Sequence, residues 1–218
     1  ATPLGERLAC IQKFKKLVAD KKSDLAKTLT EEVGKPIKQS HNELNALVGR
    51  IDFFLDNTTN VICTEGVFSE GGMTEQIEHE PLGVIGNISA WNYPYFVGSN
   101  VFVPALLTGN AVLYKPSEYT ALTGLAITEM LLEAGIPKDV FIPIIGGGAA
   151  GAALTNLPLN GMFFTGSYNT GVKIAQATAP HLMRLQLELG GKDPAYICDD
   201  ADIANAAAST ADGAMYNT

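Results

Sequence analysis

Paired cysteines are missing from this sequence of 218 residues. The three cysteines present, Cys10, Cys63 and Cys198, are odd in number, and none belongs to a C-x-x-C pair. Their spacing indicates neither a disulfide framework nor a zinc site, so we expect no metal centre. Free thiols are typical of a reducing compartment, and a cytoplasmic location is therefore the simplest expectation.

Positive charge and long apolar runs are also scarce. There are 15 Lys and Arg residues against 23 Asp and Glu residues, which gives a formal net charge of -8. A negative chain is not attracted to phosphate backbones or anionic membrane surfaces, so we expect neither nucleic acid nor a membrane as a partner. No apolar run is long enough to span a bilayer, and the N-terminus lacks the basic and then apolar profile of a secretory signal. The sequence predicts a soluble protein.

Apolar residues, by contrast, make up 46% of the chain. This share is sufficient for the core of one large domain, or of one domain plus a fragment of another. The chain starts at Ala1 without an initiator Met and enters a helical pattern almost at once. It stops at Thr218 after another helical pattern, with no terminating signal. We therefore expect that an N-terminal leader segment is missing from the sequence, and that its C-terminal end at Thr218 is equally abrupt.

The first third of the chain has a helical pattern. Apolar residues recur at spacings near three and four from residue 4 to residue 29, and a second stripe follows from residue 37 to residue 55. The tripeptide Gly34-Lys35-Pro36 ends the first pattern and opens the second. Both stripes are interpreted as surfaces that pack against a core.

Residues 61–81 are rich in glycine and charged residues and have an alternating pattern typical of a strand. Gly71-Gly72 is expected to form a turn, and residues 73–80 a polar strand. This pattern predicts a hairpin that projects from the domain. His79 has a carboxylate on each side, which in isolation could form a metal or proton site. A solvated strand face is the favoured interpretation, because no second cluster of ligands lies nearby in the sequence.

From residue 82 onward, short apolar runs alternate with helical patterns. This alternation predicts an α/β fold, with a Rossmann-like parallel sheet and helices on both faces. Strands are expected at residues 83–88, 111–114, 140–145, 161–164 and 184–187. Helices are expected at residues 95–107, 121–134, 149–154 and 170–177.

The ligand crevice of an open parallel sheet lies beyond the carboxyl ends of its strands. The five predicted strand ends lead to residues 89–92, 115–118, 146–148, 165–167 and 188–191, so every polar candidate falls on one edge of the sheet. Two of these turns are rich in glycine and lead into helices, where free N–H groups and the helix dipole favour a pyrophosphate. Residues 166–171 are thus a candidate phosphate loop, although they match neither the G-x-G-x-x-G fingerprint nor a Walker A loop. A purely structural glycine turn is the alternative.

Lys115 and Glu118 follow the second strand. Lys115 can present a charge and a hydrogen-bond donor, and Glu118 can accept hydrogen bonds from a ribose diol. A carboxylate at that position repels a 2′-phosphate, so the pair favours NAD over NADP. The alternative is helix capping, in which Pro116 and Ser117 open the helix and Glu118 complements its dipole.

Two further side chains are candidates for catalysis. Glu188 lies between Leu187 and Leu189, and we expect apolar surroundings that disfavour its charged form and suit a general base. A buried carboxylate with a structural partner is the alternative. Asn92 follows Trp91 and could donate its side-chain N–H to an oxyanion, although an Asn before a helix is commonly a cap.

Four of these turns occur in the order that marks one protein family. They are Ala90-Trp91-Asn92-Tyr93-Pro94, Lys115-Pro116-Ser117-Glu118, Phe163-Phe164-Thr165-Gly166-Ser167 and Leu187-Glu188-Leu189-Gly190-Gly191-Lys192. On these motifs the chain resembles the N-terminal, cofactor-binding portion of the aldehyde dehydrogenase superfamily, over essentially its whole length. It departs from the family at Ala90, where proline is usual, and at Tyr168, where a small residue is usual.

The resemblance implies a role for each motif. Lys115 and Glu118 would hold the adenosine ribose of NAD, and Ser167 with Gly166 would meet its pyrophosphate. Asn92 would donate to the oxyanion of a thiohemiacetal, and Glu188 would activate water for deacylation. The implied cofactor-binding residues are Ile88, Ser89, Ala90, Trp91, Lys115, Ser117, Glu118, Gly148, Gly151, Phe164, Thr165, Gly166, Ser167, Thr170 and Leu189.

The implied reaction is the NAD-dependent oxidation of an aldehyde to a carboxylic acid through a cysteine thioester. The family's nucleophilic cysteine belongs a little beyond Thr218, so we expect this chain alone to be inactive. A non-catalytic nucleotide-binding fragment is the alternative, and a related acyl-CoA or acyl-phosphate reductase is another. Retention of Glu188 favours the hydrolysing enzyme.

The resemblance also implies a division into four parts. Residues 1–60 would be the helical part of the cofactor domain, and residues 61–81 a hairpin for oligomerisation. Residues 82–193 would form the NAD-binding domain, and residues 194–218 the truncated start of the catalytic domain. The complete enzyme is expected to be a homo-oligomer.

Overall fold

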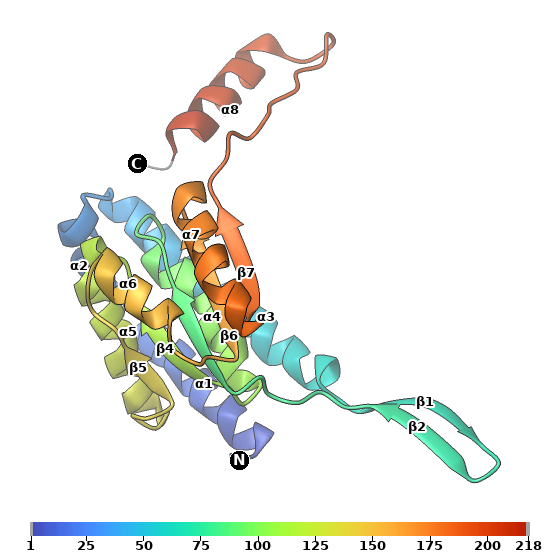
Figure 1. Ribbon diagram of the computed structural model, residues 1–218. Helices are drawn as coiled ribbons and strands as arrows, with labels where there is room; N and C mark the ends of the chain where they lie inside the picture. Colours follow the sequence, from blue (N-terminus) through green and yellow to red (C-terminus); the bar gives the residue numbers. More distant parts are fainter. Residues whose placement is uncertain (1, 217–218) are drawn as a thin grey trace.

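The computed structural model describes residues 2–216, in which a five-stranded parallel sheet organises the chain (Figure 1). The strands are β3 (Val84–Ile88), β4 (Ala111–Lys115), β5 (Phe141–Pro143), β6 (Gly161–Gly166) and β7 (Arg184–Leu189). Their spatial order is β5-β4-β3-β6-β7, and every neighbouring pair is parallel. The chain therefore builds outward from β3 on one side and then returns to β6 on the other. Such a reversal opens a crevice at the carboxyl ends of the strands.

Helices cover both faces of this sheet, which confirms the predicted α/β architecture. One face carries α4 (Pro94–Leu107) and α5 (Ala121–Ala134), and the other carries α6 (Gly148–Thr155) and α7 (Tyr168–Thr178). Two short 3-10 turns, η1 (Glu118–Thr120) and η2 (Ala179–His181), lie at loop ends.

The N-terminal helices α1 (Leu4–Asp20), α2 (Lys22–Val33) and α3 (Ile37–Val61) share one hydrophobic core with α4, α5 and the sheet. At its centre, the fully buried Phe102 ring meets Phe14, Tyr114 and Phe141 edge to face, with centroids 5.3 to 6.2 Å apart. A smaller core on the opposite face includes Met162 and Ile174. The first three helices therefore complete the sheet domain.

Side chains of these helices also bind the helices of the sheet domain. Glu32 in α2 accepts hydrogen bonds from Leu122 N (2.6 Å) and Thr123 N (2.9 Å), so it caps the first turn of α5. Arg7 Nη1 donates to Leu107 O at the end of α4 (2.6 Å), and Lys21 Nζ lies 2.6 Å from Glu133 Oε2 near the end of α5. A carboxylate at a helix N-terminus satisfies free N–H groups and complements the helix dipole.

The sequence pattern failed at one boundary in this region. We expected one continuous helical pattern up to residue 33, but the structure has a break at Lys21. No Gly or Pro marks the break, and the apolar spacing continues through it. The predicted end of the pattern is correct, because Gly34 adopts a left-handed conformation (φ 71°) after α2.

Strand boundaries also differ by a few residues. β4, β6 and β7 reach Lys115, Gly166 and Leu189, which were expected just outside the strands. β5 is shorter than the expected 140–145. Several site candidates are therefore the last residues of strands and are held by the ladder itself, which fixes them better than a free loop would.

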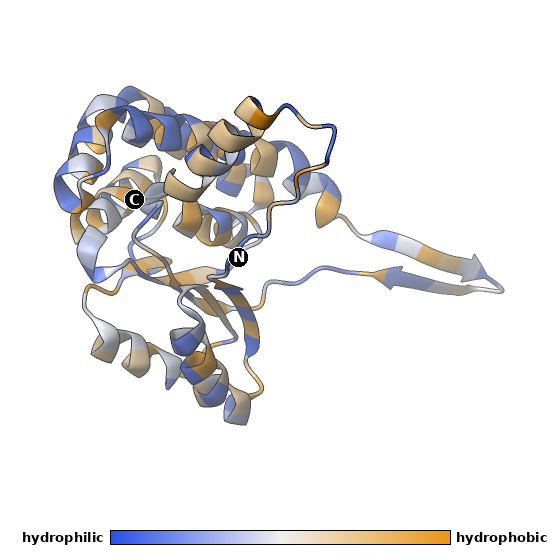
Figure 2. Ribbon diagram, turned by 90° about the horizontal axis from the view of Figure 1, so that it is seen from above, coloured by the Kyte–Doolittle hydropathy of each residue, from blue (hydrophilic) through white to orange (hydrophobic). Residues whose placement is uncertain are grey.

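The projecting hairpin is confirmed. β1 (Glu65–Glu70) and β2 (Met73–Ile77) pair antiparallel around Gly71-Gly72, and all of their residues are exposed (Figures 1 and 2). β2 ends at Ile77, so His79 lies outside the strand, and its Nε2 is 3.8 Å from Glu65 Oε1. Within residues 2–216 no group of three or more His, Cys, Asp or Glu side chains is placed to hold a metal ion.

The last helix, α8 (Ile203–Met215), stands apart from the sheet (Figure 1). Asp202 caps it by accepting from Asn205 N at 2.9 Å. None of its side chains is buried, and Ile203 and Met215 are at least 80% exposed. Residues 217 and 218, which the sequence assigned to the same part of the chain, lie outside the described residues. Among residues 2–216, no helix is both long and apolar enough to cross a membrane.

Candidate functional site

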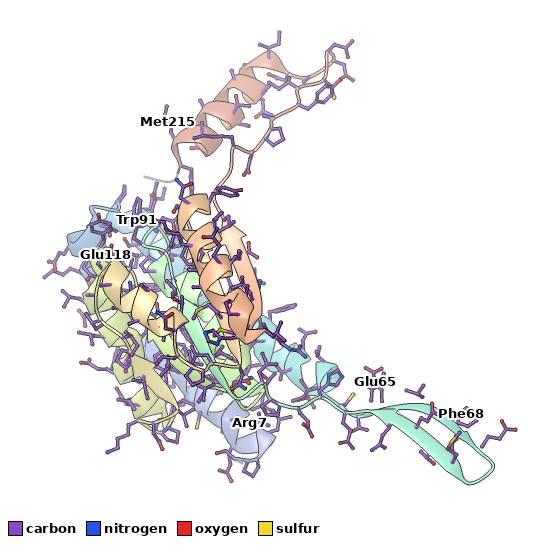
Figure 3. All side chains as sticks on the ribbon, in the orientation of Figure 1. Arg7, Glu65, Phe68, Trp91, Glu118 and Met215 are labelled. Carbon is purple, nitrogen blue, oxygen red and sulfur yellow. The ribbon has the colours of Figure 1, made fainter. Side chains whose placement is uncertain are left out.

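A cleft of about 1150 Å³ lies at the carboxyl ends of the strands. The strand ends of β3, β4, β6 and β7 line it, together with one side each of α6 and α7. It is larger than most small-molecule pockets, which measure about 300 to 1,000 Å³, so it suits an extended ligand. Trp91 and Glu118 lie at this end of the sheet (Figure 3).

The structure brings all of the site residues expected from the sequence to this one cleft. Those lining it are Ile88, Ser89, Ala90, Trp91, Asn92, Lys115, Ser117, Glu118, Gly148, Gly151, Phe164, Thr165, Gly166, Ser167, Thr170, Glu188 and Leu189.

Lys115 and Glu118 form the charged part of the cleft. The Lys115 side chain is 5% exposed, and its Nζ donates to Pro116 O at 3.1 Å and lies 3.8 Å from Glu118 Oε2. Burial lowers the pKa of Lys115, and the charge of Glu118 acts in the opposite direction. Glu118 is half exposed, so its oxygens are available to a ligand.

Ser117 supports the capping interpretation of the same tetrapeptide. Its Oγ accepts from Tyr119 N at 3.3 Å and so caps the short η1 turn, while the following helix α5 is capped by Glu32. Capping by Ser117 and ligand binding by Glu118 are compatible, because different side chains perform them.

The turn between β6 and α7 is a helix N-terminus that opens on the cleft. Ser167 Oγ accepts from Thr170 N at 3.3 Å and lies 3.0 Å from Thr170 Oγ1. Gly166 has no room for a side chain, because a Cβ would lie 2.5 Å from Phe164 Cζ. The first turn of α6, at Gly148, lines the same cleft. Two helix N-termini thus direct N–H groups and positive dipole ends to one volume, an arrangement that favours phosphate.

The loop between β3 and α4 carries Trp91 and Asn92. Ser89 N continues the strand ladder by donating to Lys115 O at 3.0 Å. Ser89 Oγ is buried and has no hydrogen-bond partner among residues 2–216. Asn92 is half-buried, and its backbone oxygen accepts from Lys35 Nζ. Because the hydroxyl of Tyr114 lies beside Ser89 Oγ, the groups that the loop offers to a ligand are the Trp91 ring and the Asn92 amide.

The apolar surroundings expected for Glu188 are wrong for this chain. Glu188 lies on β7, the edge strand of the sheet, and its side chain is exposed. Gln186 Nε2 donates to Glu188 Oε1 at 3.3 Å. Leu187 packs in the core on the α7 side, and because successive side chains of a strand point to opposite faces, Glu188 points to the other face of β7 and stays exposed.

Sequence reasoning missed cleft residues on the two helices. Gly148 and Gly151 lie on the side of α6 that faces the cleft, and Thr170 lies on the side of α7 that faces it. Positions three and four residues further along lie on the same side of a helix, so helical spacing from these residues was a usable signal. The missed lining residues on or next to these helices are Ala152, Thr155, Asn156, Lys173, Ile174 and Ala177, and Tyr119 in η1 was missed as well.

The sequence is similar to known proteins over its whole length: the model of the Aldehyde dehydrogenase family matches residues 1–218. N-succinylglutamate 5-semialdehyde dehydrogenase 1 of Caulobacter vibrioides is 36% identical over 209 residues, which are 94% of this chain and 44% of that protein. The chain therefore spans less than half the length of this curated relative.

Two solved structures share the fold. An aldehyde dehydrogenase from Bacillus cereus in complex with NAD+ is 33% identical, with a TM-score of 0.94 over 99% of this chain and 44% of that chain. An NADP-dependent enzyme of E. coli is 29% identical, with a TM-score of 0.92 over 97% of this chain and 44% of that chain.

Proposed function

Because the chain belongs to the aldehyde dehydrogenase family, we propose that it binds NAD in the strand-end cleft and supplies part of the active site of an aldehyde-oxidising enzyme. The single observation that carries this proposal is the convergence of all four motifs on one cleft at the switch point of the sheet. Two similar proteins provide further support: the Caulobacter relative is a semialdehyde dehydrogenase, and the Bacillus cereus enzyme was solved in complex with NAD+.

The lining residues fit a dinucleotide. The Lys115 ammonium is buried and donates one hydrogen bond among residues 2–216, so donors remain for a ribose. Glu118 is free to accept from the same diol. The α6 and α7 N-termini would hold the pyrophosphate. When bound, NAD supplies the acceptor for the hydride of the aldehyde.

Asn92 and Glu188 would act on the aldehyde. A thiolate attacks the carbonyl carbon, and the negative charge that develops on its oxygen would be stabilised by the Asn92 side-chain N–H. Oxidation leaves a thioester. Glu188 would then take a proton from water as the water oxygen attacks the thioester carbon, which releases the carboxylic acid and the thiolate.

The thiolate is proposed to come from sequence beyond Thr218. None of Cys10, Cys63 and Cys198 lines the cleft. The exposure of α8, which has no buried side chain, supports the same proposal, because this helix would pack on a further domain. The exposed hairpin is proposed to mediate association into a homo-oligomer, because it offers unpaired strand edges and exposed apolar side chains to a partner.

A test of cofactor choice uses Glu118. The chain should bind NAD more tightly than NADP, because the carboxylate accepts from the ribose diol and repels a 2′-phosphate. Glu118→Ser should lower the ratio of NAD to NADP affinity about tenfold, since a charged hydrogen bond contributes about 1.5 kcal/mol or more. Titration calorimetry with both cofactors measures the ratio.

Glu129→Ser, on the exposed side of α5 and away from the cleft, is the matched control and should leave the ratio unchanged. Equal affinities in the parent chain, or a Glu118→Ser variant with the parent's ratio, would contradict this cofactor assignment.

Lys115→Met should separate binding from stability. Burial lowers the pKa of the Lys115 ammonium, so below that pKa the folded state holds a buried charge that destabilises it. The free energy of unfolding therefore increases as pH rises through the pKa of the folded state. Methionine removes the charge and keeps all but the last atom of the unbranched side chain, so the melting temperature at pH 7 should not fall. NAD affinity should fall about 10- to 100-fold with the loss of a charged donor. Unchanged NAD affinity in a folded variant would remove Lys115 from the site.

A further inference from the structure

A buried ion pair contacts the loop that carries Asn92 and the start of the helix that follows it. Lys35, between α2 and α3, and Glu43 in α3 are 3% and 0% exposed, and Lys35 Nζ is 2.6 Å from Glu43 Oε2. Neither residue lines the cleft, and neither has a role in the function proposed above.

We propose that Lys35 and Glu43 form a positioning unit that fixes the Asn92 loop, and thereby aims the Asn92 amide at the reacting oxygen. This inference rests on the proposed function only for the role of Asn92. Both residues are positioning residues, because they act on the substrate only through the loop.

Glu43 holds the helix that follows the loop. Its Oε1 accepts from Tyr95 N at 2.8 Å and from Phe96 N at 3.2 Å, which are first-turn N–H groups of α4. The residue preceding α4, Tyr93, makes no side-chain cap. A glutamate from another helix therefore provides the cap that the local sequence lacks.

Lys35 holds the loop itself. Its Nζ donates to the backbone oxygen of Asn92 at 2.5 Å and lies 3.7 Å from the centroid of the Tyr93 ring. The peptide plane after Asn92 cannot rotate without losing the first contact, and the Tyr93 ring cannot leave without losing the second. Together with Glu43, the ammonium fixes the chain on both sides of the turn into α4.

The energetics favour a role in geometry over a role in stability. Burial raises the pKa of the Glu43 carboxyl, while the Lys35 ammonium and two backbone N–H groups act in the opposite direction. A buried ion pair is often no more stabilising than apolar residues of the same volume, although removing one partner alone costs about 3 to 5 kcal/mol. What an apolar pair cannot provide is the directed hydrogen bond to Asn92.

The chain contains a local reporter for this geometry. Trp91 is the only tryptophan, precedes Asn92, and is 41% exposed at the cleft (Figure 3). The decisive variant is Lys35→Met/Glu43→Gln, because it removes both charges and leaves no unpaired ion in the core. Its Trp91 emission should shift to longer wavelength, and quenching by acrylamide should increase, at an unchanged far-UV circular dichroism spectrum.

The matched control is Lys15→Met, which breaks a partly exposed ion pair between α1 and α3 (Lys15 to Asp52, 2.5 Å) and should leave Trp91 unchanged. ADP, which needs the Lys115 and Glu118 end of the cleft and the two helix N-termini but not the Asn92 loop, should bind the parent and the double variant equally. In a longer, active protein that carries this chain, the double variant should lower kcat by up to about 100-fold at an unchanged ADP dissociation constant.

A folded double variant with the parent's Trp91 emission and quenching would overturn the proposal, whether or not any cofactor binds. Failure of the parent to bind NAD or ADP would instead contradict the proposed function and leave the Trp91 result standing. If the double variant does not fold, hydrogen exchange on the parent decides: Tyr95 and Phe96 amides should be protected like interior α4 amides, and rapid exchange at both would overturn the proposal.

Discussion

The 218-residue chain, purified and incubated with NAD and a panel of aldehydes, should produce no NADH. Hydride transfer from an aldehyde requires the tetrahedral adduct that a positioned thiolate forms. Cys63 and Cys198 are exposed, Cys10 lies on α1 beside the main core, and none of the three lines the cleft. Absorbance at the NADH band, followed at enzyme concentrations high enough to see one turnover, is the measurement.

A burst of NADH equal to the protein concentration would contradict this expectation. It would show that one of the three thiols is the nucleophile, and individual Cys→Ser variants would identify which. NAD binding in the same sample, measured by calorimetry, distinguishes an inactive but competent cleft from an unfolded chain.

The second large effect concerns Asn92 and Glu188 in a longer protein that carries this chain together with the proposed nucleophile. Asn92→Ala should lower the rate of the NADH burst about 10²- to 10³-fold, as the loss of an oxyanion donor does elsewhere. Glu188→Gln should leave the burst in place and slow steady-state turnover, because deacylation then lacks its base. Rapid-mixing kinetics separate the two phases.

Asn45→Ala, on the exposed side of α3, serves as a control for substitution of an asparagine outside the cleft. A Glu188→Gln enzyme with the parent's turnover would remove Glu188 from the mechanism. An Asn92→Ala enzyme with the parent's burst rate would do the same for Asn92, and the positioning unit would then have no catalytic purpose.

The sheet and its crevice could be predicted because each depends on local signals. Short apolar runs separated by helical patterns identify parallel strands, and topology then places their carboxyl ends together. Lys115, Ser167 and Glu188 were found at the cleft for this reason, without any knowledge of their distances. The break at Lys21 could not be found, because the apolar spacing is the same on both sides of it.

Contacts between segments distant in the sequence could not be predicted. Lys35 belongs to the helix boundary Gly34-Lys35-Pro36, and no neighbouring residue indicates that its ammonium contacts Asn92, 57 residues away. Glu43 lies in an otherwise ordinary helical stripe. The exposure of Glu188 was equally hidden, because it depends on which face of β7 is covered by a helix, and the flanking leucines do not indicate this.

The contacts that tie the N-terminal helices to the sheet domain also set the order in which the chain can fold. Arg7 meets Leu107 100 residues later, Glu32 meets Thr123 91 residues later, and Lys21 meets Glu133 112 residues later. The first three helices are complete at residue 61, and α5 is complete at residue 134. During synthesis at about 5 to 20 residues per second, these helices would wait about 4 to 15 seconds for α5 to emerge. The apolar surface that packs on α5 stays uncovered for that interval, so a nascent chain of this protein should engage chaperones before its α5 is made and release them afterwards.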